Sequence, residues 1–111
     1  FGVSFLAALA VLAGSLHGIV MRGPTAPVCR VGMPCNEPAV GAMLVFSRAG
    51  HAATRVRVGA GGRYTVRLVA GTYTVREQPS PRIGFGVRPS LVRVVGGKSR
   101  RVDLFIDTGI R

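Results

Sequence analysis

Carboxylates and histidines are scarce in this chain, and tryptophan is absent. The four acidic residues are spread along the sequence: Glu37, Glu77, Asp103 and Asp107. The sequence therefore indicates no pair of carboxylates that would work together as acid and base. No serine stands in a recognisable nucleophile motif with a histidine and an acid. These shortages predict that the protein is not an enzyme.

The chain has two cysteines, Cys29 and Cys35, and both lie in a proline-rich segment, residues 23–38. Proline removes backbone donors and disfavours helix, so we expect this segment to be a loop. An even cysteine count in a chain with features of export predicts a Cys29–Cys35 disulfide. Free thiols or a metal site are the alternatives, but a metal needs more ligands, and His17 and His51 are isolated. We expect no metal ion and no cofactor.

Positive charge, by contrast, is abundant. The sequence holds 15 basic residues, of which Lys98 is the single lysine and the rest are arginines, and its formal net charge is +11. An excess of positive charge attracts polyanions. The hydrophobic content of 48% is too high for a disordered basic tail, so we expect a folded domain.

Residues 1–17 have the features of a signal peptide or a membrane anchor, which we expect to be an apolar helix. An apolar run over residues 5–13 has the length of a signal-peptide core and is followed by the small residues Gly14 and Ser15. Cleavage after Ser15 fits the small-x-small rule. The alternatives are an uncleaved membrane helix over residues 1–21 and a soluble helix of the fold. Because no methionine opens the chain, we expect residues before Phe1.

A signal peptide and an anchor both imply export, so we expect a secreted or cell-envelope protein. Residues 18–111 then form the domain, which has a length typical of one domain. It reads as short apolar or alternating runs separated by glycine- and proline-rich turns, which is typical of a β-sandwich or barrel. We predict seven strands: Gly18–Arg22, Ala42–Ser47, Thr54–Val58, Tyr64–Val69, Thr72–Glu77, Leu91–Val95 and Arg101–Ile106.

The segment from Tyr64 to Glu77 contains the tetrapeptide Tyr-Thr-Val-Arg twice. Alternation of apolar and polar residues predicts two half-buried strands. With Ala70 and Gly71 as a two-residue turn, the segment is predicted to be a hairpin whose apolar side chains share one face. In that register Leu68 lies opposite Tyr73.

This segment resembles the "G-x-Y … L-x-x-G-x-Y-x-V" signature of carboxypeptidase regulatory-like domains. The matching residues run from Gly62 to Val75, and residues 39–45 are similar to the "P-x-x-G-A-x-V" strand of the same family. Collagen-adhesin B-type repeats are related to it. The resemblance implies a seven-stranded, prealbumin-like Greek-key β-sandwich that serves as a non-catalytic accessory or structural domain.

Two activities of similar folds are not implied. Some adhesin repeats form a lysine–asparagine isopeptide bond, but Lys98 lies in a glycine turn and Asn36 lies in the cysteine loop. The chain also lacks the Tyr-Arg-Gly-Ser tail of transthyretin-related hydrolases. Residues 105–109 resemble the Asp-Thr-Gly loop of aspartic proteases, but those enzymes pair two such aspartates, so we expect a turn at a strand end.

Several arginines fall on the outward positions of the predicted strands: Arg55, Arg57, Arg67, Arg76, Arg93 and Arg101. One interpretation is a solvated face that protects the sheet edges by charge. The other is a face that binds anionic envelope polymers or lipid headgroups. Carbohydrate or another protein are further candidate partners. We expect no nucleic-acid partner, because the sequence offers no platform of interleaved aromatics for base stacking. Membrane contact is expected through residues 1–17 alone, if they are not cleaved.

The predicted disulfide can be tested directly. We expect peptide mapping without reduction to recover Cys29 and Cys35 in one cross-linked fragment. Because the closed loop is short, the double variant Cys29→Ser/Cys35→Ser should lower the free energy of unfolding by about 2 kcal/mol. Alkylation of both cysteines without prior reduction would contradict the disulfide.

Overall fold

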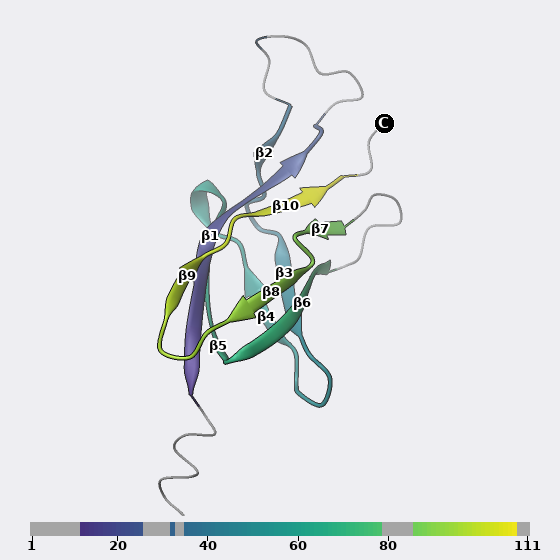
Figure 1. Cartoon of the computed structure of the whole chain (residues 1–111). Coiled ribbons are helices and arrows are strands. Elements are labelled where there is room, and N and C mark those ends of the chain that lie inside the picture. The colour runs from purple at the N-terminus through teal and green to yellow at the C-terminus, as the bar shows by residue number, and fades with distance from the viewer. Residues whose placement is uncertain (1–11, 26–31, 33–34, 79–85, 109–111) are drawn as a thin grey trace, which may run out of the picture.

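A computed structural model describes residues 12–25, 32, 35–78 and 86–108. These residues form ten strands in two sheets, and no α-helix occurs among them (Figure 1). The strands are β1 (Ala13–Gly23), β2 (Glu37–Pro38), β3 (Met43–Ser47), β4 (Thr54–Arg57), β5 (Arg63–Val69), β6 (Gly71–Gln78), β7 (Gly86–Arg88), β8 (Leu91–Val94), β9 (Ser99–Arg101) and β10 (Leu104–Asp107). A short 3-10 turn, η1 (Ala60–Gly62), precedes β5. The predicted all-β class is confirmed.

The long strand β1 is the centre of a six-stranded sheet (Figure 1). Its first part, Ala13–Ile19, pairs antiparallel with β5, and Ser15–His17 pairs parallel with β9. Its last part, Val20–Gly23, pairs parallel with β10, and β2 pairs there as well. Strand β7 extends the sheet beyond β10. One strand therefore has neighbours along both of its edges.

The second sheet has four strands in the order β4-β3-β6-β8, and each neighbouring pair is antiparallel. Side chains of the two sheets meet in one core. Phe46 of β3 and Tyr64 of β5 stack there with ring centroids 6.1 Å apart. Other core residues are Leu16, Val20, Leu44, Val66, Leu68, Tyr73, Val75, Val92, Val94, Leu104 and Ile106. Each large apolar side chain buried in this way stabilises the fold by about 1.5–3 kcal/mol.

The predicted hairpin from Tyr64 to Glu77 is wrong. Both runs are strands, but β5 pairs with β1 in one sheet, whereas β6 pairs with β3 and β8 in the other. The chain leaves the first sheet at Val69 and enters the second at Gly71, so Ala70 alone connects them. Alternation fixes which side chains point inward, and the same ones point inward in either arrangement. The pattern therefore does not select the neighbour of each strand.

Arg48 is bound at the connection between the two sheets. Its Nη1 donates a hydrogen bond to the carbonyl oxygen of Ala70 at 3.0 Å, and its guanidinium carbon lies 5.3 Å from the centre of the Tyr73 ring. The Tyr73 hydroxyl donates to the Val69 carbonyl at 2.6 Å. These bonds supply partners for carbonyl groups where the chain changes sheets.

The strand count also differs from the expected seven. Strand β2 is short and lies at the end of segment 23–38, which was expected to be a loop, and the short strand β7 was not predicted. The predicted strand Arg101–Ile106 is two strands, β9 and β10, which share one register along β1. Asp103 lies at the break, where its Oδ1 accepts a hydrogen bond from the Ile19 N–H at 2.9 Å. A side-chain oxygen takes the place of a backbone partner there, so the ladder is interrupted.

The expected helix over residues 1–17 is not found among the described residues of that segment. Residues 1–11 lie outside the described part of the chain, and Ala13–His17 belong to β1. The first strand therefore begins five residues before the expected Gly18. Cleavage after Ser15 would remove the first three residues of β1, which pair with β5. Within the described ranges, no helix is long and apolar enough to cross a membrane.

Glycine at position 18 allows the chain to approach β1 closely. A Cβ atom built on Gly18 would lie 2.4 Å from the carbonyl oxygen of Val102, which is far closer than two such atoms can come. Tyr64 is paired with Gly18 in the β1–β5 ladder, and its hydroxyl donates a hydrogen bond to that same carbonyl. The absence of a side chain thus admits both the Val102 backbone and the Tyr64 ring.

We expect Gly18→Ala to destabilise the protein. The added methyl group would displace backbone atoms, which typically costs about 1–3 kcal/mol in a packed core. Gly59→Ala is a matched control, because the added Cβ would lie 3.7 Å from its nearest neighbour, an ordinary contact. Chemical denaturation should separate the two variants. Equal stabilities would contradict the close approach at Gly18.

Candidate functional site

All six arginines predicted to point outward are exposed. They do not share one face. Four lie on the second sheet: Arg55 and Arg57 on β4, Arg76 on β6 and Arg93 on β8. The remaining two, Arg67 and Arg101, lie on β5 and β9 of the first sheet.

The four arginines of the second sheet form what we call the arginine face: Arg55, Arg57, Arg76 and Arg93. Cross-strand pairing places Arg55, Val45 and Arg76 in one row over three adjacent strands. Val45 points away from the core, yet it is 0% exposed. Arg55 Nε reaches over this strand and donates to Gln78 Oε1 at 2.8 Å. Long arginine stems bury apolar surface in this way while their charged ends stay in water.

Strands β3, β4, β6 and β8 carry no carboxylate on their outward positions, all of which the structure describes. On the first sheet the balance differs, because Asp103 forms an ion pair with Arg101 at 3.1 Å. Arg63 of β5 is a further exposed arginine there, which the sequence reading did not include. Carboxylates therefore neutralise less of the positive charge on the arginine face than on the outer surface of the first sheet.

An open cleft adjoins the arginine face. Its volume is about 530 Å³, and the arginines that line it among the described residues are Arg22, Arg55 and Arg57. Glu77, Gln78 and the segment from Val40 to Met43 are the other described residues of the lining. We call it the arginine cleft. Ligand pockets commonly have volumes of about 300–1,000 Å³, so its size suits a small organic group.

Each of the three arginines of the cleft is held by a hydrogen bond to the protein. Arg22 Nε contacts Glu37 Oε2 at 3.1 Å, and Arg57 Nη1 donates to the carbonyl oxygen of Gly41 at 2.7 Å. Arg55 is held by Gln78, as described above. A guanidinium has several N–H donors in a fixed plane, and these bonds use one donor each. The side chains are therefore oriented and still have donors for a ligand.

Among the described residues that line this cleft, Glu77 is the one with a carboxylate. Burial raises its pKa, and the neighbouring positive charge of Arg22 opposes that rise. Arg22 was not predicted as a site residue, because it lies in a separate strand. It lines the same cleft as Arg57 because the two sheets pack on each other, and no local sequence pattern reports this.

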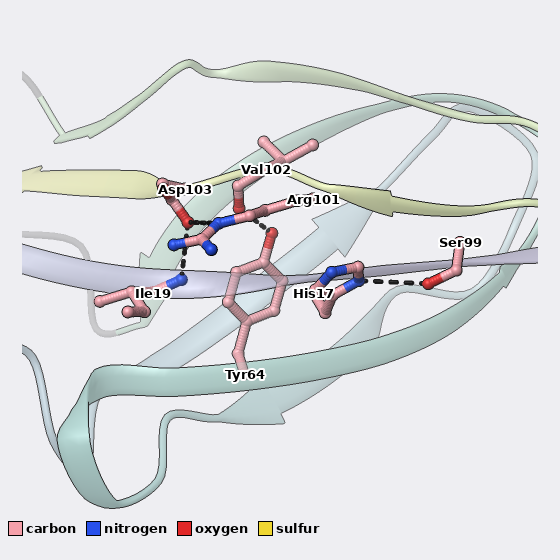
Figure 2. Close-up of polar contacts among 7 residues, drawn as sticks. All are labelled: His17, Ile19, Tyr64, Ser99, Arg101, Val102 and Asp103. Atoms are coloured by element: carbon pink, nitrogen blue, oxygen red, sulfur yellow. Dashed lines mark hydrogen bonds and ion pairs between the residues drawn. The ribbon is translucent and has the colours of Figure 1, made fainter.

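A second polar cluster joins β1, β5 and the β9–β10 segment (Figure 2). Ser99 Oγ and His17 Nδ1 are 3.2 Å apart, and Arg101 Nε contacts Asp103 Oδ1 at 3.1 Å. The same Asp103 oxygen accepts the Ile19 N–H, so Figure 2 shows the carboxylate directed at β1 and Arg101.

The pKa of Asp103 is lowered, first by the Ile19 N–H and then by the hydrogen bond from Arg101. Burial raises the pKa of Tyr64 to about 12, and the negative charge of Asp103 adds to the effect. Serine, histidine and aspartate are thus neighbours, although the sequence shows no such motif. The aspartate is bonded to a backbone N–H and an arginine rather than to the imidazole, so the contacts differ from a catalytic relay. They join strands.

The predicted disulfide and the protease-like motif both include residues outside the described part of the chain. Cys29 lies outside the described residues, so the Cys29–Cys35 disulfide stays a prediction. Asp107 ends β10 and is buried, whereas Gly109 of the protease-like motif is also outside the described ranges. Among the residues that are described, no three histidine, cysteine, aspartate or glutamate side chains gather as a metal site.

Several solved structures resemble this fold. The Bacillus anthracis TIE protein matches with a TM-score of 0.55 and 19% identity, over 86% of this chain and 16% of that one. GBS52, the minor pilin of Streptococcus agalactiae, matches with a TM-score of 0.56 and 14% identity, over 88% and 45%. A DUF3823 family protein from Parabacteroides merdae gives 0.53 and 16%, over 86% and 46%.

No protein-family model matches the chain, and no curated protein matches it either. The chain spans less than half of each of these three structures. At such identities the likeness shows the fold alone, which is a β-sandwich of two sheets.

Tyr64 predicts a dependence of stability on alkaline pH. Its pKa is raised in the folded protein, so its contribution to stability is complete below the ordinary pKa of 10.0 and is lost as the pH rises toward about 12. We expect the free energy of unfolding to fall over this interval. Tyr64→Phe should flatten the decline and cost about 1 kcal/mol at neutral pH for the lost hydrogen bond.

Tyr73→Phe provides the matched control, since it removes the other tyrosine hydroxyl, which bonds to Val69. Denaturant titrations at several pH values supply the measurement. A decline that is equally steep with and without the Tyr64 hydroxyl would show that this group does not cause it.

Proposed function

We propose that the protein is a non-enzymatic β-sandwich module, exported from the cytoplasm, that binds anionic polymers of the cell envelope through its arginine face. The observation that carries this proposal is the set of four outward arginines on the second sheet, without a carboxylate among the outward positions of its strands. A net charge of +11 adds long-range attraction for polyanions.

Pairing across the sheet supports a linear ligand. Arg55 and Arg76 flank Val45 in one row, and Arg57 lies further along β4. A rigid sheet holds such side chains at fixed positions, whereas arginines on a flexible tail would have to be ordered on binding. Repeated anionic groups along a polymer can contact several of these positions at once.

The assignment as an exported accessory module rests on separate grounds. The sequence resembles carboxypeptidase regulatory-like and collagen-adhesin B-type domains, and the fold is similar to part of a minor pilin. The apolar run at residues 5–13 is typical of a signal peptide or an anchor. A purely structural role within a larger surface protein is the second candidate, and the same fold likeness favours it.

Binding to immobilised alginate, a carboxylated polysaccharide, tests the proposal. We expect retention at ~50 mM salt and release near ~200 mM, because added salt screens the arginine charges and reduces the free energy gained by releasing counterions. The variant Arg76→Gln/Arg93→Gln should weaken binding roughly tenfold and reduce the salt dependence.

Arg67→Gln/Arg101→Gln is the matched control, since it removes the same charge from the first sheet. It should retain most of the affinity. An equal loss in both double variants would show that net charge, rather than the arginine face, governs binding. Absence of retention at low salt would favour the structural role.

A further inference from the structure

We infer that the arginine cleft is a specific subsite for an oxyanion group, a carboxylate or a phosphate, carried on a hydroxylated chain. This inference rests on the proposed function and names the part of the ligand that this end of the arginine face would take.

The three guanidinium groups come from both sheets, with Arg22 on β1 and with Arg55 and Arg57 on β4. Each is fixed by a protein acceptor: Glu37 for Arg22, Gln78 for Arg55 and the Gly41 carbonyl for Arg57. Planar N–H groups that remain can bind an oxyanion through two parallel hydrogen bonds. Pre-ordered donors of this kind lower the entropic cost of binding.

The remaining lining suits a hydroxylated ligand. Glu77 supplies acceptor oxygens for hydroxyl groups, and the amide group of Gln78 can both donate and accept. Val40 is 51% exposed and gives the cleft an apolar surface. Sugars and polyols present this combination of hydroxyl groups and weakly polar C–H faces. A bare inorganic anion would use the arginines alone.

The cleft is continuous with the arginine face. Arg55 and Arg57 belong to both, and Arg55 continues the row toward Arg76 across β3. A polymer lying along the face would therefore bring one of its charged groups to the cleft. In the cleft, Arg22 adds a positive charge from the first sheet. The part of the arginine face around Arg76 and Arg93 has no such added charge from Arg22.

Short ligands separate the cleft from the extended face. We expect tri-galacturonate, a carboxylated trisaccharide, or glycerol 3-phosphate to shift the amide signals of residues 40–43 and 77–78 in NMR titrations at low salt. A neutral galactose trisaccharide should bind at least tenfold more weakly. The two charged probes distinguish a carboxylate from a phosphate ligand, and binding of either one supports the inference.

Arg22→Gln/Arg57→Gln should lower the affinity for the charged probe by at least tenfold, while Arg76→Gln/Arg93→Gln should leave it unchanged. If the double variant is poorly folded, Arg22→Gln alone can be used in its place, because it leaves the Arg57–Gly41 bond intact. It should give a smaller loss of affinity than the double variant. Circular dichroism checks the fold of each variant. Equal binding of charged and neutral probes, no binding of either charged probe, or equal losses in both double variants would overturn the inference. Alginate binding that persists in those cases would leave the proposed function in place.

Discussion

The first sheet depends on the close approach of other backbone segments to β1. That strand is paired along both edges, and two of its inward positions are glycines. A Cβ at Gly14 would lie 2.1 Å from the carbonyl oxygen of Val95, and one at Gly18 would lie 2.4 Å from that of Val102. Glycine ordinarily weakens a strand interior, but here it allows the C-terminal strands to cross and join β1. The Tyr64 ring then occupies the core beside Gly18.

The joining of β9 and β10 to β1 also affects the charge on the outer surface of the first sheet. At the break between β9 and β10, the Asp103 carboxylate accepts the Ile19 N–H and also neutralises Arg101. The negative charge that completes the ladder of the first sheet thus reduces the positive charge of its exposed side. The second sheet has a regular antiparallel ladder with no such break, and its outward arginines keep their charge.

Period-two alternation is a local property, and it predicted what is local: the β-strands of the Tyr64–Glu77 segment, their inward faces and the outward arginines. The strand partners predicted from it were wrong, because Leu68 and Tyr73 are buried whether their strands pair side by side or face each other across the core. Alternation also did not predict the break between β9 and β10 at Asp103, because the alternating run continues through that residue. Arg22 joins the cleft through contacts between sheets, and its own strand gives no sign of them.

The abundance of arginine has a physical consequence at the cleft that the charge count does not express. A lysine ammonium is a point charge, and binding it to a protein acceptor draws the same group away from a ligand. A guanidinium can be fixed through one N–H and present the others in a known plane. Arg57 bonds to a backbone carbonyl and Arg22 to a carboxylate, yet both line the same open space. These bonds orient both guanidinium groups in the ligand-free protein. Binding of the proposed oxyanion would therefore depend on its shape and position as well as on its charge.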